Sequence, residues 1–262
     1  MNILLTNDDG IFAPGLRALA EALLPLGTVR AVAPEREQSA AGHAITLHKP
    51  LRMDRVELPG LPVEAYSSNG TPADCVILGC LTAVTRPDVV VSGINKGANM
   101  GEEILYSGTV SAAMEAALQG LRALAVSSCS YEAEDFSTAA RVAALLAGPV
   151  QAAVLPEDCF LNVNVPAVAW GELTGVEITH LGRRAYINAV ERREDPRGRA
   201  YYWYTGSPQE SRRGPGTDIG AVAAGRVSLT PVHFDLTNHE AMPALAGVAE
   251  ELSGHFPGQE KG

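Results

Sequence analysis

Residues 2 to 10 of this chain read NILLTNDDG, and this stretch indicates the fold. Its first half, NILLT, is a short apolar run of the kind that forms a buried strand. A helical pattern follows, with Pro14-Gly15 near its start. The apolar positions of that pattern recur at helical spacing, at Leu16, Leu19, Ala20, Leu23 and Leu24. A strand followed directly by an amphipathic helix predicts the start of an alternating α/β structure.

The alternation continues over roughly the first 165 residues. Because the expected strands are almost continuously apolar, both faces of their sheet must be covered by helices. Right-handed crossovers then give an α/β fold, a Rossmann-like, doubly wound and mostly parallel sheet. The expected strands are 28–33, 88–92, 122–127 and 160–165, with short strand-like pieces within 45–66; helices are expected at 72–84, from about Ser107, and at 135–147.

The C-terminal third has a different character. Residues 183–206 are rich in Arg, Tyr and Glu, and the turn signal Asp195-Pro196-Arg197-Gly198 separates two extended arms. This predicts a projecting β-hairpin, although an ordinary half-buried hairpin would have the same pattern. Residues 226–230 predict a return strand, and 240–253 a final helix. We therefore assign 1–182 to the Rossmann-like core and 183–262 to C-terminal elements that do not form an independent domain.

Composition narrows the classes of partner. The chain has 262 residues and a formal net charge of -10, which makes long nucleic acid an unfavourable partner. A small anionic substrate is still acceptable if its site carries a metal or backbone donors. No apolar stretch reaches the ~20 residues that a membrane span needs, and no basic, apolar leader opens the chain, so we expect a cytoplasmic protein without a membrane partner. The cysteines form no C-x-x-C pair and are expected to be buried free thiols.

Polar segments follow the strands at the edge where parallel sheets bind ligands. The first is Asn7-Asp8-Asp9-Gly10. Two adjacent carboxylates at the end of a buried strand repel each other and are costly to desolvate, and a divalent cation would resolve both problems. Gly10 relaxes the backbone, so that both side chains could turn toward one point. A helix N-cap followed by a turn acid would use the same residue types, so this segment alone leaves both interpretations open.

Three further segments have the same polar character. Ser39 lies in the loop PEREQSAAGHA at 34–44, and Asn95 lies in SGINKG at 92–97. The serine hydroxyl and the amide oxygen suit a hard cation such as Mg or Mn, and Lys96 could offset phosphate charge. The segment YSGTVSAA at 106–113 opens a helix, whose free N–H groups and dipole attract anions. A solvated loop serine, an ordinary glycine-rich turn and a simple Ser/Thr helix cap are the alternative interpretations.

Parallel topology would bring these segments to one rim of the sheet. There, Asp8, Asp9, Ser39 and Asn95 would form a metal site of hard oxygen ligands, beside a phosphate seat where Ser107 and Thr109 add hydroxyl donors. A cation that activates water, next to donors that orient the ester, is what metal-assisted phosphate hydrolysis requires. The sequence pattern leaves the role of His43 open between a general acid, a phosphate donor and an ordinary loop residue.

Motifs along nearly the whole chain give it a clear resemblance. The chain resembles the SurE family of 5'/3'-nucleotidases, also called survival protein E or stationary-phase survival proteins. The motifs that carry the resemblance are LLTNDDG at 4–10, P-x-x-x-x-S at Pro34 to Ser39, GTPADCV at 70–76, SGINKGANMG at 92–101, YSGTVSAAMEA at 106–116 and VSLTP at 227–231.

The resemblance implies a cytoplasmic phosphatase with one divalent metal ion per subunit, Mg, Mn or Co. Nucleoside 5'- and 3'-monophosphates would be the substrates, with short polyphosphate as a further possibility. The metal ligands would be Asp8, Asp9, Ser39 and Asn95, and one of the two acids would orient or deprotonate the water. The phosphate would be surrounded by Asn7, Gly97, Ser107, Gly108 and Thr109.

The resemblance also implies a homodimer or homotetramer in which C-terminal elements are exchanged between subunits. The hairpin at 183–206 fits such an arm, and its aromatic run Tyr201-Tyr202-Trp203-Tyr204 would suit a contact between subunits.

Other chemistries are less well matched. A phosphatase that forms a phosphoenzyme would carry two aspartates separated by one residue, whereas Asp8 and Asp9 are adjacent. A non-catalytic dinucleotide-binding module would carry G-x-G-x-x-G after the first strand, where Asn7-Asp8-Asp9-Gly10 stands instead. A glycosidase needs its carboxylates roughly 5 to 9 Å apart, which neighbouring residues rarely achieve.

Overall fold

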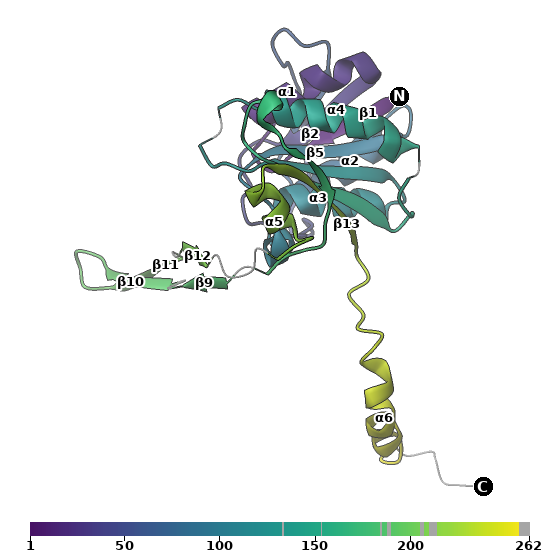
Figure 1. Cartoon of the computed structure of the whole chain (residues 1–262), viewed down its shortest axis with the longest axis vertical. Helices are drawn as coiled ribbons and strands as arrows, with labels where there is room; N and C mark the ends of the chain where they lie inside the picture. The colour runs from purple at the N-terminus through teal and green to yellow at the C-terminus, as the bar shows by residue number, and fades with distance from the viewer. Residues whose placement is uncertain are drawn as a thin grey trace.

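The computed structural model describes residues 1–132, 134–152, 154–183, 185–187, 190–204, 207–209 and 214–256. Figure 1 shows an α/β body at the top, from which a β-hairpin and a C-terminal helix project in different directions. The body contains the strands and helices predicted for the first 165 residues, so the α/β fold class is confirmed.

Within the described ranges, nine strands form one sheet in the order β3-β4-β2-β1-β5-β6-β7-β13-β8. The six strands from β4 to β7 in that order run parallel, whereas β3 is antiparallel to β4, and β13 is antiparallel to β7. The strand bounds are β1 (Asn2–Thr6), β2 (Thr28–Pro34), β3 (Met53–Val56), β4 (Glu64–Ser68), β5 (Val89–Lys96), β6 (Arg122–Ser128), β7 (Cys159–Val165), β8 (Gly175–Ile178) and β13 (Arg226–His233).

Helices cover both faces of the sheet (Figure 1). On one face, Ile3 and Leu5 of β1 join a buried apolar cluster with α1 (Pro14–Leu23) and α4 (Ser137–Gln151). On the other face, Leu4 joins a second cluster with α2 (Pro72–Thr82) and α3 (Gly108–Leu118). Successive side chains of a strand point to opposite faces, so a run of leucine and isoleucine in β1 supplies both clusters. This explains why the predicted strand is continuously apolar rather than alternating.

The strand order places a topological switch point between β1 and β5. From β1 the chain proceeds through β2 to β4 on one side, and it then returns to β5, β6 and β7 on the other side. Ligands bind at such a point, beyond the carboxyl ends of the strands, because the loops diverge there and leave a crevice. The segments that follow β1 and end β5 are those in which the sequence predicts the site.

Strand β5 is longer than predicted. The sequence places its end at Ser92, but its pairing with β6 continues to Lys96, with an irregularity between Gly93 and Asn95. The glycines at 93 and 97 suggest a turn in the sequence, whereas backbone pairing with the neighbouring strand holds this segment extended. Asn95 is therefore held by the sheet and not by a loop.

The predicted core boundary at residue 182 is wrong. Strand β13 lies inside the sheet between β7 and β8, and its Val227 is buried in the same apolar cluster as β1. The core therefore includes the return strand and the short helix before it, α5 (Asp218–Ala223). Sequence patterns also missed β8, because its side chains lie mostly exposed at the sheet edge and show no apolar run.

The predicted hairpin projects from the body (Figure 1). Strands β10 (Val190–Glu194) and β11 (Ala200–Tyr204) pair antiparallel, and Asp195 Oδ1 accepts the N–H groups of Arg197 and Arg199 in the turn between them. All described residues of β11 are exposed, so the half-buried alternative is excluded. Nearer the body, β9 (Ala185–Ile187) pairs with β12 (Ser207–Gln209). Residues 184, 188–189 and 205–206 of the predicted hairpin lie outside the described residues.

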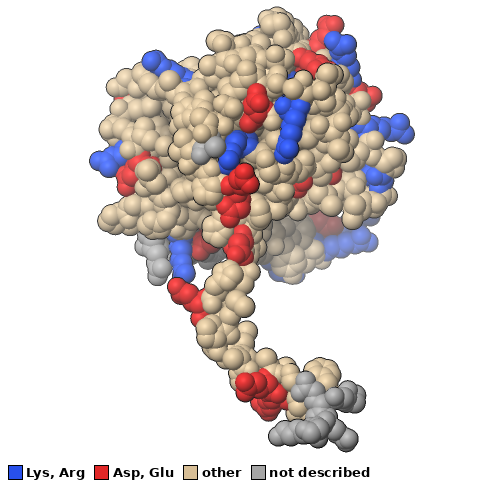
Figure 2. Space-filling view, turned by 90° about the vertical axis from the view of Figure 1, so that its right-hand side faces the viewer, with Lys and Arg blue, Asp and Glu red and all other residues tan. Residues whose placement is uncertain are grey.

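The C-terminal helix stands clear of the body at the end of an extended segment (Figure 2). Helix α6 (Ala246–Ser253) follows a 3-10 turn at Met242–Leu245, and no described residue of α6 is buried.

On the face drawn in Figure 2, basic and acidic side chains are interspersed over the body. No helix in the described parts of the chain has the length and apolar character needed to cross a membrane. The described part of the body also contains 3-10 turns at Leu24–Leu26, at Trp170–Glu172 and, just before α3, at Gly101–Leu105.

Candidate active site

Asn7 braces the turn that presents the two acids. Its side-chain nitrogen donates to the Gly10 carbonyl at 2.9 Å, and the Gly10 N–H donates to its side-chain oxygen at 3.1 Å. Asn7 is 0% exposed, and Gly10 has a φ of +104°, a backbone conformation that favours glycine. In this geometry the Asn7 amide is used within the turn, behind Asp8 and Asp9, where it positions them. The predicted contact of Asn7 with phosphate stays a prediction.

Asp8 faces the N-terminus of α3. The Thr109 hydroxyl donates to its carboxylate, and the backbone N–H groups of Gly108 and Thr109 also favour the charged form. Burial dominates nevertheless and raises the pKa of Asp8 above its ordinary value. The helix start therefore contacts an acid of the turn directly. Thr109 is fully buried and its hydroxyl donates a hydrogen bond to Asp8, while its predicted contact with phosphate stays a prediction.

Asp9 lies between Asp8 and the end of β5. Burial raises the pKa of Asp9 to about 6, and the negative charges of Asp8 and Glu37 add to that effect. The backbone N–H and the ammonium group of Lys96 act in the opposite direction. Both acids are thus held in an environment that disfavours negative charge, and neither forms an ion pair in the described parts of the structure. A divalent cation would compensate this cost.

The Ser39 turn connects the acids to the helix start. The N–H of Gln38 donates to the Asp8 carbonyl at 2.7 Å, and the N–H of Gly42 donates to the Tyr106 carbonyl at 3.0 Å. Ser39 lies between these two anchors, as the prediction of a shared rim requires. Its side chain is exposed, and its hydroxyl donates to Glu37 at 2.5 Å. The turn is therefore in place, while the Ser39 oxygen is engaged by a third acid.

Asn95 and Gly97 lie at the carboxyl end of β5. The Asn95 side-chain nitrogen donates to the Gly97 carbonyl at 2.9 Å, so the amide oxygen is the end that suits a metal. Gly97 is buried, with a φ of +112°, and the Tyr131 ring covers the position where a Cβ would stand, at 2.4 Å from its nearest atom. A larger residue at position 97 would displace that ring. Gly97 thus shapes the rim beside Asn95.

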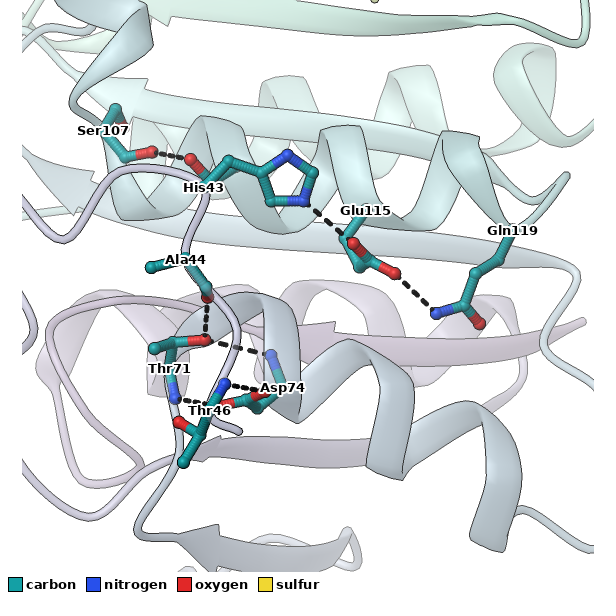
Figure 3. Close-up of polar contacts among 9 residues, drawn as sticks. His43, Ala44, Thr46, Thr71, Asp74, Ser107, Glu115 and Gln119 are labelled. Carbon is teal, nitrogen blue, oxygen red and sulfur yellow. Dashed lines mark hydrogen bonds and ion pairs between the residues drawn. The ribbon is translucent and has the colours of Figure 1, made fainter. Parts of the chain in front are cut away.

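Ser107 is the N-cap of α3. Its hydroxyl oxygen accepts the N–H of Val110 at 3.1 Å, and Gly108 and Thr109 form the first turn of the helix. His43 does not join this turn through its ring, because its Nε2 lies 2.8 Å from the carboxylate of Glu115, further along α3 (Figure 3). The structure therefore brings together the turns at 7–10 and 38–42, the end of β5 and the start of α3, and turns the His43 ring toward the helix side.

The donor set suits a hard cation. Among the described residues, no cluster of three or more His, Cys, Asp or Glu could hold a metal, so a site here needs neutral oxygens as well as acids. Asp8, Asp9, Ser39 and Asn95 supply two carboxylates, a hydroxyl and an amide, which is the ligand chemistry of Mg or Mn.

Sequence reasoning missed Glu37 and Glu115. Glu37 lies in a loop without periodicity, and Glu115 lies within a helix, where the sequence does not show what it faces.

Comparison with known proteins shows the family of this chain. The family model described as "Survival protein SurE" matches residues 3–188. The protein named 5'-nucleotidase SurE from Moorella thermoacetica is 51% identical to this chain, and the match covers 99% of each of the two chains. The protein of the same name from Geobacter sulfurreducens is also 51% identical, and the match covers 94% of this chain and 92% of that protein. The crystal structure of SurE from Aquifex aeolicus has a TM-score of 0.85 and 41% identity, and the match covers 95% of this chain and all of that one. The chain belongs to the SurE family.

Proposed function

We propose that this protein is a divalent-metal-dependent phosphomonoesterase that hydrolyses nucleoside 5'-monophosphates to nucleoside and phosphate. The proposal extends to nucleoside 3'-monophosphates and short polyphosphate. One observation carries it: two adjacent, desolvated carboxylates stand at the switch point of the sheet, and one of them, Asp8, contacts the start of α3. A cation site beside an anion site is the arrangement that hydrolysis of a phosphate ester uses. The names of the relatives support the nucleotide substrate.

The residues have distinct roles in this mechanism. Asp8, Asp9, Ser39 and Asn95 would hold the cation, which supplies water activation and charge neutralisation when bound. The phosphate oxygens would lie at the start of α3, beside Ser107, Gly108 and Thr109, with Gly97 at the rim. In this structure the N–H groups of Gly108 and Thr109 act on Asp8 instead.

Of the two acids, Asp9 is the more exposed, whereas Asp8 receives the Thr109 hydroxyl. We therefore assign to Asp9 the orientation of the attacking water and the acceptance of its proton.

A phosphate-release assay tests the proposal. The full chain is supplied with 5'- and 3'-nucleoside monophosphates of each base and with tripolyphosphate, in the presence of Mg, Mn or Co, before and after chelation. We expect release from nucleoside monophosphates that chelation abolishes and that at least one of these metals restores, because the site holds uncompensated acids. An unchanged rate under chelation would contradict the metal's role. Retention of nucleotide without phosphate release would indicate a binding module, and a trapped aspartyl-phosphate would indicate the phosphoenzyme chemistry.

We further propose a homodimer or homotetramer with exchanged C-terminal elements. Large apolar and aromatic side chains on both projecting elements lie exposed to solvent, which a monomer does not ordinarily tolerate over long segments. They are Tyr202, Trp203 and Tyr204 in the hairpin, and Leu245, Val248, Leu252 and Phe256 in the C-terminal segment. Light scattering of the full chain is expected to give two or four times the 27.5 kDa subunit mass. A mass of one subunit at micromolar concentration would contradict this assembly.

A further inference from the structure

The segment that follows the Ser39 turn is fastened to two helices. Residues 43–46, which we name the clasp segment, run between the start of α2 and the middle of α3 (Figure 3). In that view, the His43 ring reaches toward α3, while Ala44 and Thr46 lie against Thr71 and Asp74 of α2. The clasp segment follows the Ser39 turn directly after Gly42, so the position of one constrains that of the other.

Glu115 holds the first end of the clasp segment. Its Oε2 lies 2.8 Å from His43 Nε2, and its Oε1 accepts the Gln119 side-chain N–H at 2.9 Å. The Glu115 side chain is only 13% exposed, so both carboxylate oxygens are committed in a sheltered place. The bond from His43 is the largest cause that holds the pKa of Glu115 below its ordinary value. Such a sheltered bond competes with water less than an exposed pair does.

Asp74 holds the other end. Its Oδ1 accepts the backbone N–H of Thr46 at 3.1 Å, and its Oδ2 accepts that of Thr71 at 2.9 Å. The Thr71 hydroxyl accepts the N–H of Asp74 and donates to the Ala44 carbonyl at 2.7 Å. The capping box of α2 is thereby extended to hold the clasp segment, and Asp74 is 1% exposed. The GTPAD part of the 70–76 motif is used for this attachment.

We propose that His43 and Glu115 are positioning residues that hold the Ser39 turn over Asp8 and Asp9, and that metal affinity depends on them. The inference rests on the proposed function in one respect, the role of Ser39 as a metal ligand. His43 lies four positions after Ser39, which is at most about 14 Å of extended chain. The Ser39 turn is exposed, and the Ser39 Oγ is bonded to Glu37. The turn is therefore kept near the two acids by its attachments at Gln38 and at Gly42. His43 accordingly acts through Glu115 and not as the general acid.

Manganese titration of the metal-free full chain tests the inference, with water-proton relaxation as the readout. We expect His43→Ala and Glu115→Ala each to weaken Mn²⁺ binding by about 10-fold to 100-fold, the range found when outer-shell partners of metal ligands are removed. The double variant is expected to bind Mn²⁺ as tightly as the single variant with the lower affinity, because the two residues act as a unit. Glu115→Gln keeps an acceptor for the imidazole N–H and is expected to recover most of the affinity.

A control and a second readout separate the outcomes. Glu21→Ala removes the exposed Arg17–Glu21 pair on α1, at 3.1 Å, and is expected to leave Mn²⁺ affinity unchanged. Hydrogen exchange at Gln38 and Gly42 is expected to quicken in Glu115→Ala while the rest of the sheet stays protected. Unchanged Mn²⁺ affinity in both single variants, or a lowered kcat for His43→Ala at unchanged affinity, would overturn this inference alone. Failure of the wild-type chain to bind any divalent metal would overturn the proposed function instead.

Discussion

Asp8→Asn is expected to abolish phosphate release while leaving the fold intact. Asp8 supplies a carboxylate to the proposed metal site, and a bound cation contributes several kcal/mol of charge stabilisation in the transition state. Loss of about 4 kcal/mol corresponds to roughly a thousandfold lower rate. Asparagine keeps the size of the side chain and an oxygen that can accept the Thr109 hydroxyl, so packing against α3 should persist. Steady-state kinetics at saturating Mn²⁺ and circular dichroism give the two readouts. A near-normal rate would remove Asp8 from the mechanism.

The same variant should change how stability depends on pH. In the metal-free protein, the pKa of Asp9 is raised from 3.8 to about 6, so the folded state binds its proton more tightly than the unfolded state does. The stability from this group is therefore present at low pH and is lost as pH rises from 3.8 to about 6. Asp8→Asn removes the titration of Asp8, whose pKa is also raised by burial, and the negative charge that helps to raise the pKa of Asp9. Both effects should make the loss of stability over that interval smaller. Thermal unfolding of the chelated protein across this pH range measures it. An unchanged pH dependence would contradict the raised pKa values of the two acids.

Gly108→Ala is expected to disable the site although alanine is the better helix former. A Cβ at position 108 would stand 2.6 Å from Asp8 Cβ and 2.9 Å from Asp8 Oδ2. Asp8 is buried and cannot swing aside freely, so either its carboxylate or the start of α3 must shift. A displacement of about 1 Å can cost on the order of 100-fold in rate. We expect a loss of that size in kcat/KM, together with weaker Mn²⁺ binding.

Gly148→Ala is the matched control for this variant. Gly148 lies in α4, and nothing beyond its two chain neighbours approaches within 4 Å of the position that its Cβ would occupy. Because Pro149 follows directly and disfavours a Cβ on the helical residue before it, we expect no gain in the free energy of unfolding, and activity should not change. If Gly108→Ala behaved like Gly148→Ala in both respects, close contact between α3 and Asp8 would not be needed for the reaction.

The sequence by itself determined the α/β fold, the family and the segments of the candidate site. Burial repeats along the chain with the period of each element, so an apolar run such as NILLT and a helical pattern such as that after Pro14 identify a covered parallel sheet. The carboxyl-end rule then selects the polar segments that follow the strands. Local signals of this kind need no knowledge of distant contacts, which is why they could be identified before the structure.

Only the tertiary structure decided which donor meets which acceptor. Thr109 reaches Asp8 across 101 positions of sequence, and His43 reaches Glu115 across 72. Neither pairing has a periodic signature, because each depends on how closely α3 packs against the end of β1 and against the loop after β2. The insertion of β13 into the sheet is of the same kind, since strand order is set by the pairing of remote backbones. Local pattern specifies elements, whereas packing of the assembled layers specifies partners.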